Sequence, residues 1–498
     1  MEKAKTSRLN LIPQIGLITA IAYGVGSVIG SGIFKKPGLM AAQLGSPILL
    51  IIVWLVTGLM TLFGALSIAE IASIFPRSGG LYIYFTECYN RLTGYLYGWA
   101  VFIVIQTGSI ASIAYVFSDS LGYFFNFFRL PASWEAIALH IPYLGVITPF
   151  MFFGLKLCTI GLVLFLTFVN YLAVSLGGAV QVIFTALKIG AILAIVVFAF
   201  LFGGGSFDNF TTSSLPLKAG DGSMFLAFIV AMSGAFWVYD GWINVTYSAG
   251  EIKNPKKNLP RTLFYSALIY ISIYLLINLA YIYIIPVPEM AHKYVAAEES
   301  GQAYLVATDV AGSFWGKWGG AIIAIAISVS TFGTVNGTIM LSARVYFAMA
   351  REGLFPRRIG EVHPRFRTPA RSLFIQGIWT SLLVLSGTFD QLTDMLIFVS
   401  WIFYALGALG VIVLRKKMPD APRTYRVWGY PVLPIVFIIF SLVFLGFTLY
   451  SDITSYAQGK TPLINSLMGV VLVAAGIPGY LYWNWKNKKR ARASSKIT

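Results

Sequence analysis

The sequence is short of the residues that make a water-soluble surface, a cross-linked fold or a catalytic centre. Only 11% of its 498 residues are charged, against about 25% in an ordinary soluble domain, so it cannot cover two or more soluble domains with a polar surface. Two cysteines exclude a disulfide-rich class, and no zinc-type cluster, nucleotide-binding loop or nucleophile motif is present. We therefore expect no enzyme, no catalytic residue, no metal and no cofactor.

Long apolar runs are what the sequence has instead. Hydrophobic residues make up 57% of the chain and aromatic residues 15%, and the mean hydropathy is +0.77. A membrane-spanning helix needs about 20 apolar residues. The pattern predicts an all-α integral membrane protein whose first span is retained and not cleaved as a signal peptide. Twelve transmembrane helices are expected, at residues 14–34, 47–71, 93–121, 149–174, 178–202, 223–248, 262–286, 318–349, 371–387, 392–414, 430–450 and 464–485.

The basic residues indicate how these spans are oriented. Most of the 36 lysines and arginines fall on the side of the membrane that holds both termini, if the number of spans is even. The positive-inside rule then places both termini in the cytoplasm of a multi-pass protein of the cell membrane. The net charge of +17 is spread over short loops that face anionic lipid, so we expect membrane lipid and no nucleic acid as a partner.

Glycines interrupt the first span at Gly24, Gly26, Gly30 and Gly32. Glycine weakens a helix interior, and non-helical backbone at membrane depth is tolerated only when it is buried in protein or lines a cavity. The half-helix after such a break offers free amides to a carboxylate, and the half-helix before it offers carbonyls to an ammonium. Close helix packing through small residues is an equally good explanation of this span taken alone.

The sixth span favours the first explanation. Its centre carries Asp240 and Gly241 in the string Phe236 to Trp242, five spans after the first break. This pattern is typical of inverted repeats, whose site lies between the broken first helices. We expect a first five-helix repeat at residues 1–202, an inverted second repeat at 203–414, and two further helices with a basic tail at 415–498.

Few ionisable residues fall within spans, and each is a functional candidate. Asp240 either binds an ammonium or caps the broken helix, and we favour capping. Lys188 lies too deep in span 5 to reach the interface easily, so its ammonium is expected to link span 1 carbonyls to span 8 hydroxyls, or to carry a proton. Glu70 and Arg344 lie near span ends, where structural ion pairs are expected.

Five ordered motifs resemble the amino acid–polyamine–organocation (APC) superfamily. The most specific one looks like the L-type amino acid transporter (LAT) branch and its bacterial relatives. The motifs are Ile29 to Phe34, Ala69-Glu70 with Pro76 to Gly80, Tyr239 to Trp242, Gly250 to Pro260, and Ser330 to Gly337 running on to Ser342-Ala343-Arg344 and Ala350 to Pro356.

The resemblance implies a LeuT-like 5+5 inverted repeat with discontinuous helices 1 and 6, and a sodium-independent site for a free amino acid. The amides of Gly30 to Gly32 would receive the carboxylate, and carbonyls at Ile29, Trp237 and Tyr239 the ammonium. Trp237 would be the aromatic gate, Lys188 would occupy a sodium position, and Ser400 would face the substrate side chain. The implied substrate site comprises Ile29, Gly30, Ser31, Gly32, Ile33, Trp237, Val238, Tyr239, Asp240, Gly241 and Ser400.

The same reasoning limits the substrate and the partners. No dedicated charge faces a charged side chain, so a neutral amino acid such as alanine, serine or threonine is favoured. Family analogy favours an exchanger (antiporter) that works by alternating access, and a proton-coupled symporter remains the alternative. A receptor or an enzyme would need a sizeable soluble domain or a catalytic cluster, and this sequence has neither. Cys158 falls inside span 4 and not in the long outer loop 118–149, so no heavy-chain subunit is expected.

Overall fold

The computed structural model describes residues 15–142, 145–172, 177–218, 223–300, 303–366 and 368–494. The predicted cytoplasmic N-terminal segment lies outside the described residues. The same is true of residues 143–144 in the outer loop, of 173–174 at the predicted end of span 4, and of the last four residues of the chain.

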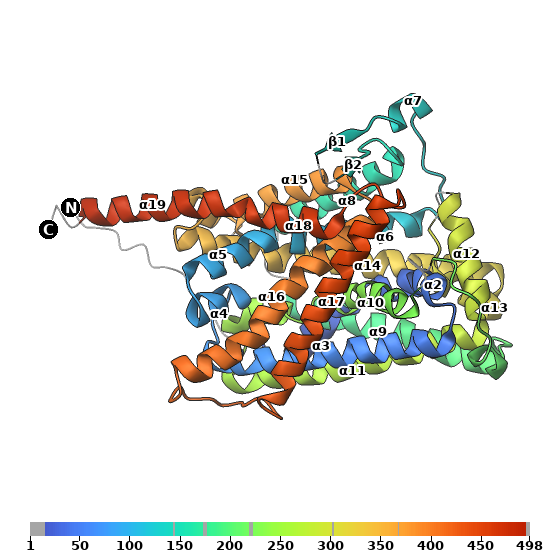
Figure 1. The fold of residues 1–498 in the computed structure, drawn as a ribbon, viewed down its shortest axis with the longest axis horizontal. Helices are drawn as coiled ribbons and strands as arrows, with labels where there is room; N and C mark the ends of the chain where they lie inside the picture. The colour runs from blue at the N-terminus through green and yellow to red at the C-terminus, as the bar shows by residue number, and fades with distance from the viewer. Residues whose placement is uncertain are drawn as a thin grey trace.

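Long helices run side by side between two ends of the molecule (Figure 1). They are α1 (Leu17–Val28), α2 (Gly32–Leu44), α3 (Pro47–Ile74), α5 (Arg91–Ala100) continued by η1 (Val101–Ile105) and α6 (Gln106–Leu121), α8 (Phe153–Leu172), α9 (Gly177–Phe202), α10 (Met224–Tyr239) followed by η3 (Asn244–Glu251), α11 (Pro255–Ile284), α14 (Lys317–Arg351), α15 (Ala370–Ser386), α16 (Phe389–Lys417), α17 (Val432–Ala457), α18 (Asn465–Ala474) and α19 (Gly476–Ser494).

Short elements close the two ends. One end carries α4 (Leu81–Cys88) and the C-terminal end of α19, and the other carries α12 (Val287–Glu299) and α13 (Val306–Trp315) (Figure 1). The long loop between α6 and α8 holds α7 (Ala132–Glu135) and an antiparallel pair of strands, β1 (Leu139–Ile141) and β2 (Gly145–Ile147), in which Leu139 lies opposite Ile147. Two short 3-10 turns, η2 (Phe207–Phe210) and η4 (Arg357–Gly360), complete the described elements.

The helices confirm the predicted fold class. Among the described residues, ten helices are long and apolar enough to cross a membrane, and the bent pair α1 and α2 makes an eleventh span. The shorter apolar helix α15 occupies the predicted ninth span. One boundary was wrong: the first span does not end at residue 34 but continues through α2 to Leu44, because Lys35 and Lys36 are paired with the carboxylates of Asp119 and Asp390.

Local signals explain where several helices begin. Ser46 accepts a hydrogen bond from the Leu49 amide and Pro47 follows it, which starts α3. Thr388 and Gln391 form a reciprocal capping box at the start of α16. Gly45 ends α2 with a φ of +60°, a left-handed conformation that glycine adopts without a steric penalty.

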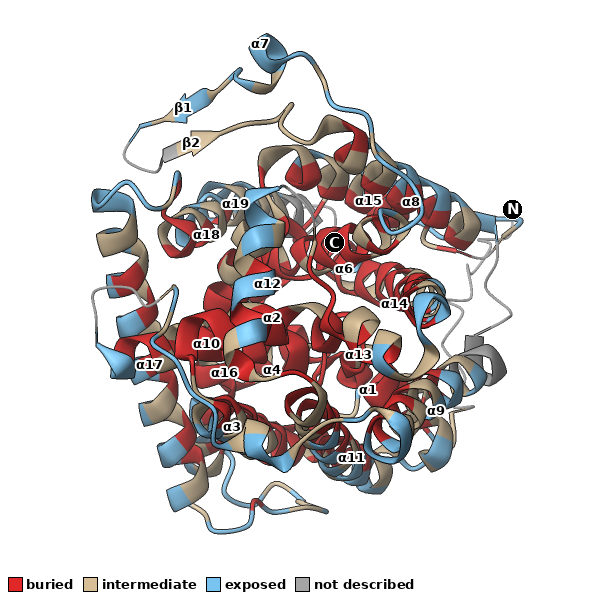
Figure 2. Ribbon diagram, turned by 90° about the vertical axis from the view of Figure 1, so that its right-hand side faces the viewer, coloured by how far each residue is buried: buried red, intermediate tan, exposed pale blue. Residues whose placement is uncertain are grey.

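The two interrupted spans lie in the centre of the bundle. Figure 2 shows buried residues gathered on α1, α2, α10 and α16, whereas α9, α11 and α17 expose one side. The helix α10 packs against α2, α3 and α16, and α1 packs against α9 and α11. Helices α3 and α11 also pack along each other.

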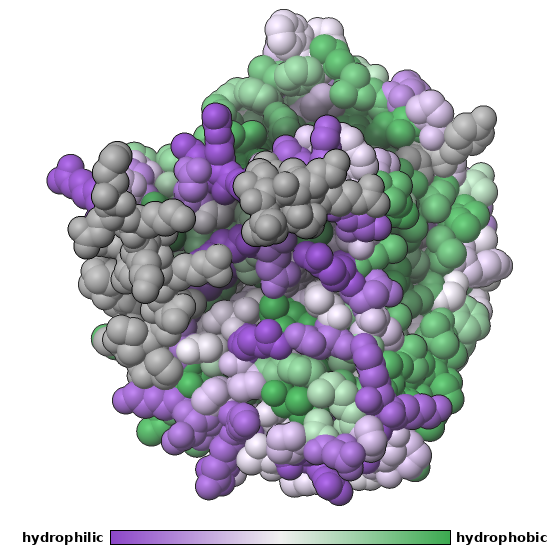
Figure 3. All heavy atoms as spheres, turned by 90° about the vertical axis from the view of Figure 1, so that its left-hand side faces the viewer, coloured by the Kyte–Doolittle hydropathy of each residue, from purple (hydrophilic) through white to green (hydrophobic). Residues whose placement is uncertain are grey.

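The surface divides as a membrane protein requires. Viewed from the left-hand end of Figure 1, hydrophilic residues gather across the end of the molecule and hydrophobic residues cover the right-hand flank (Figure 3). Large apolar side chains of α8, α9 and α17, such as Phe165, Leu201 and Ile439, are exposed. Apolar side chains exposed on this scale fit contact with lipid.

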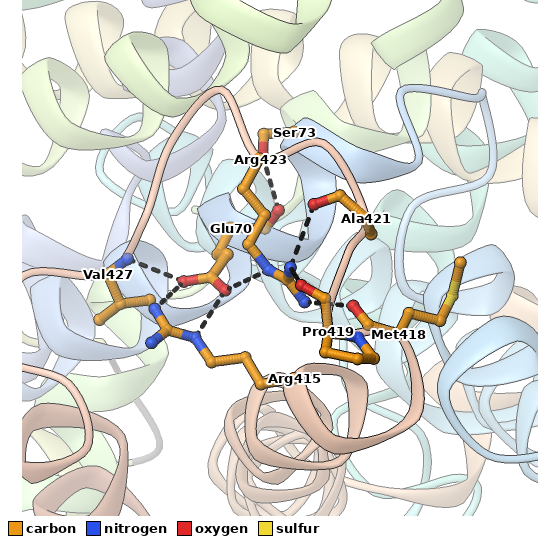
Figure 4. Close-up of polar contacts among 8 residues, drawn as sticks. All are labelled: Glu70, Ser73, Arg415, Met418, Pro419, Ala421, Arg423 and Val427. Atoms are coloured by element: carbon orange, nitrogen blue, oxygen red, sulfur yellow. Dashed lines mark hydrogen bonds and ion pairs between the residues drawn. The ribbon is translucent and has the colours of Figure 1, made fainter.

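A buried ion cluster around Glu70 ties α3 to the end of α16 and the loop after it (Figure 4). The Glu70 carboxylate accepts hydrogen bonds from Arg415 (Nε to Oε1 2.9 Å, Nη2 to Oε2 2.7 Å), from Arg423 (Nε to Oε1 3.2 Å) and from the Val427 amide (2.8 Å). The side chain is 1% exposed. The ion pair expected at Glu70 is therefore present, with two arginines.

Glu70→Gln is expected to destabilise the protein by roughly 3–5 kcal/mol, because removing one member of a buried ion cluster leaves the other charges uncompensated. Thermal unfolding of the purified protein in detergent would measure the effect. Glu87→Gln is the matched control, since the Arg77–Glu87 pair is largely exposed and such pairs contribute little. Equal melting temperatures for the two variants would contradict this prediction.

Candidate functional site

The first span is broken at the glycines that the sequence indicated. Helix α1 ends at Val28, Ile29 is extended, and α2 begins at Gly32 with a bend of 41° between the two halves. The first amides of α2 have no acceptor within their own helix, and the last carbonyls of α1 have no donor within theirs. Ser31 is buried at the break, and its hydroxyl has no hydrogen-bond partner among the described residues.

The sixth span is broken at the predicted aspartate and glycine. Helix α10 ends at Tyr239, Asp240 is extended, and the chain resumes as η3 at Asn244. Gly241 has a φ of +96°, and a Cβ built on it would lie 2.5 Å from the Ser27 carbonyl oxygen. Only glycine fits this conformation and this close approach to the first span.

The two breaks face each other across a small cavity. A Cβ on Gly32 would lie 2.5 Å from Cζ3 of Trp237, so the start of α2 lies directly against the end of α10. The space between them is about 20 Å³, enough for about one water molecule. The lining residues are Ser27, Val28, Gly30, Ser31, Gly32, Ser109, Ile113, Trp237, Val238, Asp240, Gly241, Asn244, Thr334 and Thr338.

The structure brings most of the predicted site residues to this cavity but not all of them. Gly30, Ser31, Gly32, Trp237, Val238, Asp240 and Gly241 line it. Ile29, Ile33, Tyr239 and Ser400 are buried but are not among its lining residues. For Ile29 and Tyr239 the predicted roles belong to backbone carbonyls, whereas Ser400 was expected to present its side chain.

Sequence reasoning missed the hydroxyl and amide side chains in the lining. Ser27, Ser109, Asn244, Thr334 and Thr338 come from four different elements. Thr334 and Thr338 are four residues apart in a motif already singled out, and this spacing places both on one face of a helix. This spacing is the sequence signal from which the two threonines could have been found.

Asp240 is held by a tyrosine that no sequence motif indicated. The Tyr404 hydroxyl on α16 donates to Asp240 Oδ1 at 2.6 Å. This bond fixes one carboxylate oxygen at the edge of the cavity and connects α10 to α16. Nearby, the Gln106 side chain donates to Asn244 Oδ1 at 3.0 Å and connects α6 to η3.

Lys188 lies beside the cavity and not in its lining. It is buried on α9, and its ammonium lies 2.5 Å from the Thr334 hydroxyl on α14. A Cβ on Gly30 would lie 3.9 Å from the methyl group of Thr334, so Thr334 lies next to both Lys188 and the first break. One turn earlier on α9, the Thr185 hydroxyl donates to the Ala22 carbonyl of α1 at 3.1 Å. Spans 5, 8 and 1 therefore meet at this point.

Charged residues cover the cavity on the side of α12 and α13. The ring of Trp237 packs edge-on against Phe389 with centroids 4.9 Å apart, and the ammonium groups of Lys35 and Lys36 lie 4.0 and 4.8 Å from the Phe389 ring centroid. Lys35 pairs with Asp119 at 2.5 Å, and Lys36 pairs with Asp390 at 2.6 Å. These pairs hold α2 against α6 and α16.

Backbone contacts close the opposite side. Ile15 pairs with Ile252 in a parallel bridge, so the start of span 1 is attached to the segment after η3. Arg344 forms an ion pair with Glu251 at 3.2 Å, as expected for a residue at a span end. The Gly79 amide donates to the Tyr247 carbonyl at 3.1 Å. These contacts join the start of span 1, the segment after η3, α14 and the loop after α3.

These features define a class of protein. A small polar cavity lies in a membrane-spanning bundle, between two broken helices. Carriers that work by alternating access have this arrangement. Among the described residues no group of acids, histidines and cysteines could hold a metal ion, and the lining chemistry is that of binding and not of catalysis.

Comparison with known proteins gives the family. The model of the amino acid permease family matches residues 15–474, and the chain belongs to this family. It is 32% identical over 479 residues to the serine/threonine exchanger SteT of Bacillus subtilis (strain 168), covering 96% of this chain and 97% of that one.

Two mammalian proteins are similar over nearly the whole chain. The large neutral amino acids transporter small subunit 2 of Homo sapiens is 32% identical over 491 residues, 95% of this chain and 82% of that one. The b(0,+)-type amino acid transporter 1 of Mus musculus is 29% identical over 492 residues, which cover 98% of this chain and 92% of that one. The resemblance to the LAT branch of the APC superfamily is confirmed, and the protein is an amino acid transporter of the membrane and not an enzyme.

Proposed function

We propose that this transporter exchanges small neutral L-amino acids, such as alanine, serine or threonine, across the cell membrane without sodium. The cavity between the two broken helices carries the proposal. A free amino acid has a carboxylate and an ammonium close together, and the break in span 1 presents amides and carbonyls at one point. Because about 20 Å³ is far too small for an amino acid, the cavity must expand to bind one.

The predicted roles of the site residues are retained in this proposal. Amides at Gly30, Ser31 and Gly32 bind the carboxylate, and carbonyls at Ile29, Trp237 and Tyr239 bind the ammonium. Trp237 is the gate, since its ring covers Gly32 and contacts Phe389. The unpartnered Ser31 hydroxyl supports a ligand here, because buried polar atoms are nearly always hydrogen-bonded. Ser400 is proposed to face the substrate only after the cavity expands.

The lining favours a neutral substrate with a small side chain. Asp240 is the one charged residue among the described lining residues, and Tyr404 already binds its carboxylate. Hydroxyl groups of Ser109, Thr334 and Thr338 suit a serine or threonine hydroxyl. The similarity to a serine/threonine exchanger supports the same substrate class.

Sodium independence and the absence of a partner subunit are proposed from where Lys188 and Cys158 lie in the fold. The Lys188 side chain stands at the junction of spans 1, 5 and 8 and supports transport without sodium, since its nitrogen lies where the resemblance places a sodium ion. We also propose inverted repeats at 1–202 and 203–414, cytoplasmic termini and no heavy-chain subunit. Cys158 lies within α8 and not in the outer loop before it, which supports the last point.

Purified protein in liposomes tests the proposal. Uptake of labelled serine would be followed in sodium-free buffer, with and without internal serine, and each of the twenty amino acids would compete from outside. We expect uptake that requires internal substrate, ignores a pH gradient and is blocked by small neutral amino acids. Uptake into empty liposomes driven by an inward proton gradient would instead establish a symporter.

A further inference from the structure

One tyrosine hydroxyl of span 7 contacts both helix breaks. Tyr274 Oη lies 2.8 Å from the carbonyl oxygen of Val28, the last residue of α1, and 3.1 Å from that of Val238, next to the end of α10. Both carbonyls belong to residues that line the cavity. A hydroxyl donates a single proton, so it is shared between two acceptors that belong to different spans.

The ring of Tyr274 is held in this position by aromatic neighbours. It packs edge-on against Trp54 of α3 with centroids 5.7 Å apart, and against Tyr239 of α10 with centroids 5.0 Å apart. Tyr239 in turn donates to the Trp54 carbonyl at 3.1 Å. The side chain of Tyr274 is fully buried, so the hydroxyl cannot turn to another partner without moving these rings.

The two carbonyls are placed next to those that the proposed function assigns to the substrate ammonium. Val28 directly precedes Ile29, and Val238 lies between Trp237 and Tyr239. The last carbonyl groups of a helix accept no hydrogen bond from within that helix. The unwound segment that follows is free to rotate its peptide planes. A donor that fixes Val28 and Val238 therefore fixes the direction of the neighbouring peptide groups.

We propose that Tyr274 is a positioning residue for substrate binding, which joins the two helix breaks and orients the carbonyls that receive the ammonium. This inference rests on the proposed function. The hydroxyl does not compete with the substrate, because each carbonyl oxygen has two lone pairs and can accept a second hydrogen bond. Losing the hydroxyl should therefore weaken binding and not strengthen it.

Tyr274→Phe tests the inference, and Tyr270→Phe is its matched control. Tyr270 lies one turn earlier on α11 and packs against the same Tyr239 ring at 5.8 Å, but its hydroxyl has no hydrogen-bond partner among the described residues. Both variants keep the ring. Serine exchange into serine-loaded liposomes would be measured for KM and maximal rate, together with the melting temperature of each purified variant.

For Tyr274→Phe we expect KM for serine to rise by about three- to tenfold, as the loss of one hydrogen bond would predict. The maximal rate and the melting temperature should stay near those of the parent protein, and Tyr270→Phe should change none of the three. A purely structural role would lower the melting temperature and leave KM alone.

Equal KM values for the two variants, or a lower KM for Tyr274→Phe, would overturn the inference. If Tyr274→Phe yields little folded protein, serine-dependent thermal stabilisation of the folded fraction gives the affinity, and an unchanged affinity also overturns it. Failure of the parent protein to transport any amino acid would instead refute the proposed function, so the two failures are distinguishable.

Discussion

Gly32→Val is expected to abolish transport and substrate binding while the protein still reaches the membrane. A Cβ at this position would lie 2.5 Å from Cζ3 and 2.9 Å from Cε3 of Trp237, and 2.7 Å from Cγ2 of Val238. No real Cβ makes contacts this short, so α2 must move away from α10. The first amides of α2 then lose the position in which they meet a carboxylate. Serine exchange and serine-dependent thermal stabilisation would both fall to background.

Gly190→Val is the control for this experiment. Gly190 lies on α9, its Cβ would have no neighbour within 4 Å, and the residue is exposed. This variant should transport normally.

A second pair of variants distinguishes crowding from misfolding. Gly32→Ala alone should impair binding. Adding Trp237→Phe should restore part of the binding, because phenylalanine lacks the Cζ3 and Cε3 atoms of Trp237 that clash with the new Cβ. Full serine affinity in Gly32→Val would mean that the break serves only helix packing.

The features that the sequence predicted well are those that depend on local composition. Apolar runs of sufficient length identify spans whatever their neighbours are. The breaks at Gly30 to Gly32 and at Asp240–Gly241 could be located because glycine and a mid-span acid weaken a helix at their own position. The break in span 6 needs Gly241 in particular, since its φ of +96° excludes most other residues.

Features that depend on distant partners could not be predicted in this way. The predicted first span ends at residue 34, before Lys35 and Lys36, because charged residues normally end a span. They lie in α2 instead, and Lys36 is 1% exposed, because Asp119 and Asp390 neutralise them. Asp390 is 354 positions away in the sequence. Without knowing which helices are neighbours, the pattern cannot show that such a partner exists.

The same limit explains the residues that were missed or misplaced at the site. Tyr274 is one tyrosine among several on α11, and nothing local distinguishes it from Tyr270, whose hydroxyl lacks a partner. Its role follows from where α1 and α10 end relative to α11. Ser400 is placed at the site by resemblance to a family position, and in the structure it lies outside the cavity lining.

Lys188→Ala is expected to lower the rate of serine exchange by at least about tenfold without reducing the amount of folded protein. The ammonium holds the Thr334 hydroxyl at 2.5 Å, and Thr334 in turn donates to the Ser330 carbonyl at 2.9 Å. Removing the ammonium leaves buried polar groups without their partner, and the free energy lost, about 1–3 kcal/mol, corresponds to a change of about 5- to 150-fold, with tenfold towards its lower end. Because Thr334 lines the cavity, the loss should affect transport directly.

Two variants make this prediction specific. Leu187→Ala changes the adjacent residue, whose side chain is exposed on the outside of the bundle, and should transport at the parent rate. Thr334→Val removes the hydroxyl that contacts Lys188, so it should slow exchange too. The double variant Lys188→Ala, Thr334→Val should be little worse than Lys188→Ala alone, because the two residues act through one contact. Additive losses would show that Lys188 acts independently of Thr334, and a normal rate in Lys188→Ala would remove its proposed role at the junction of spans 1, 5 and 8.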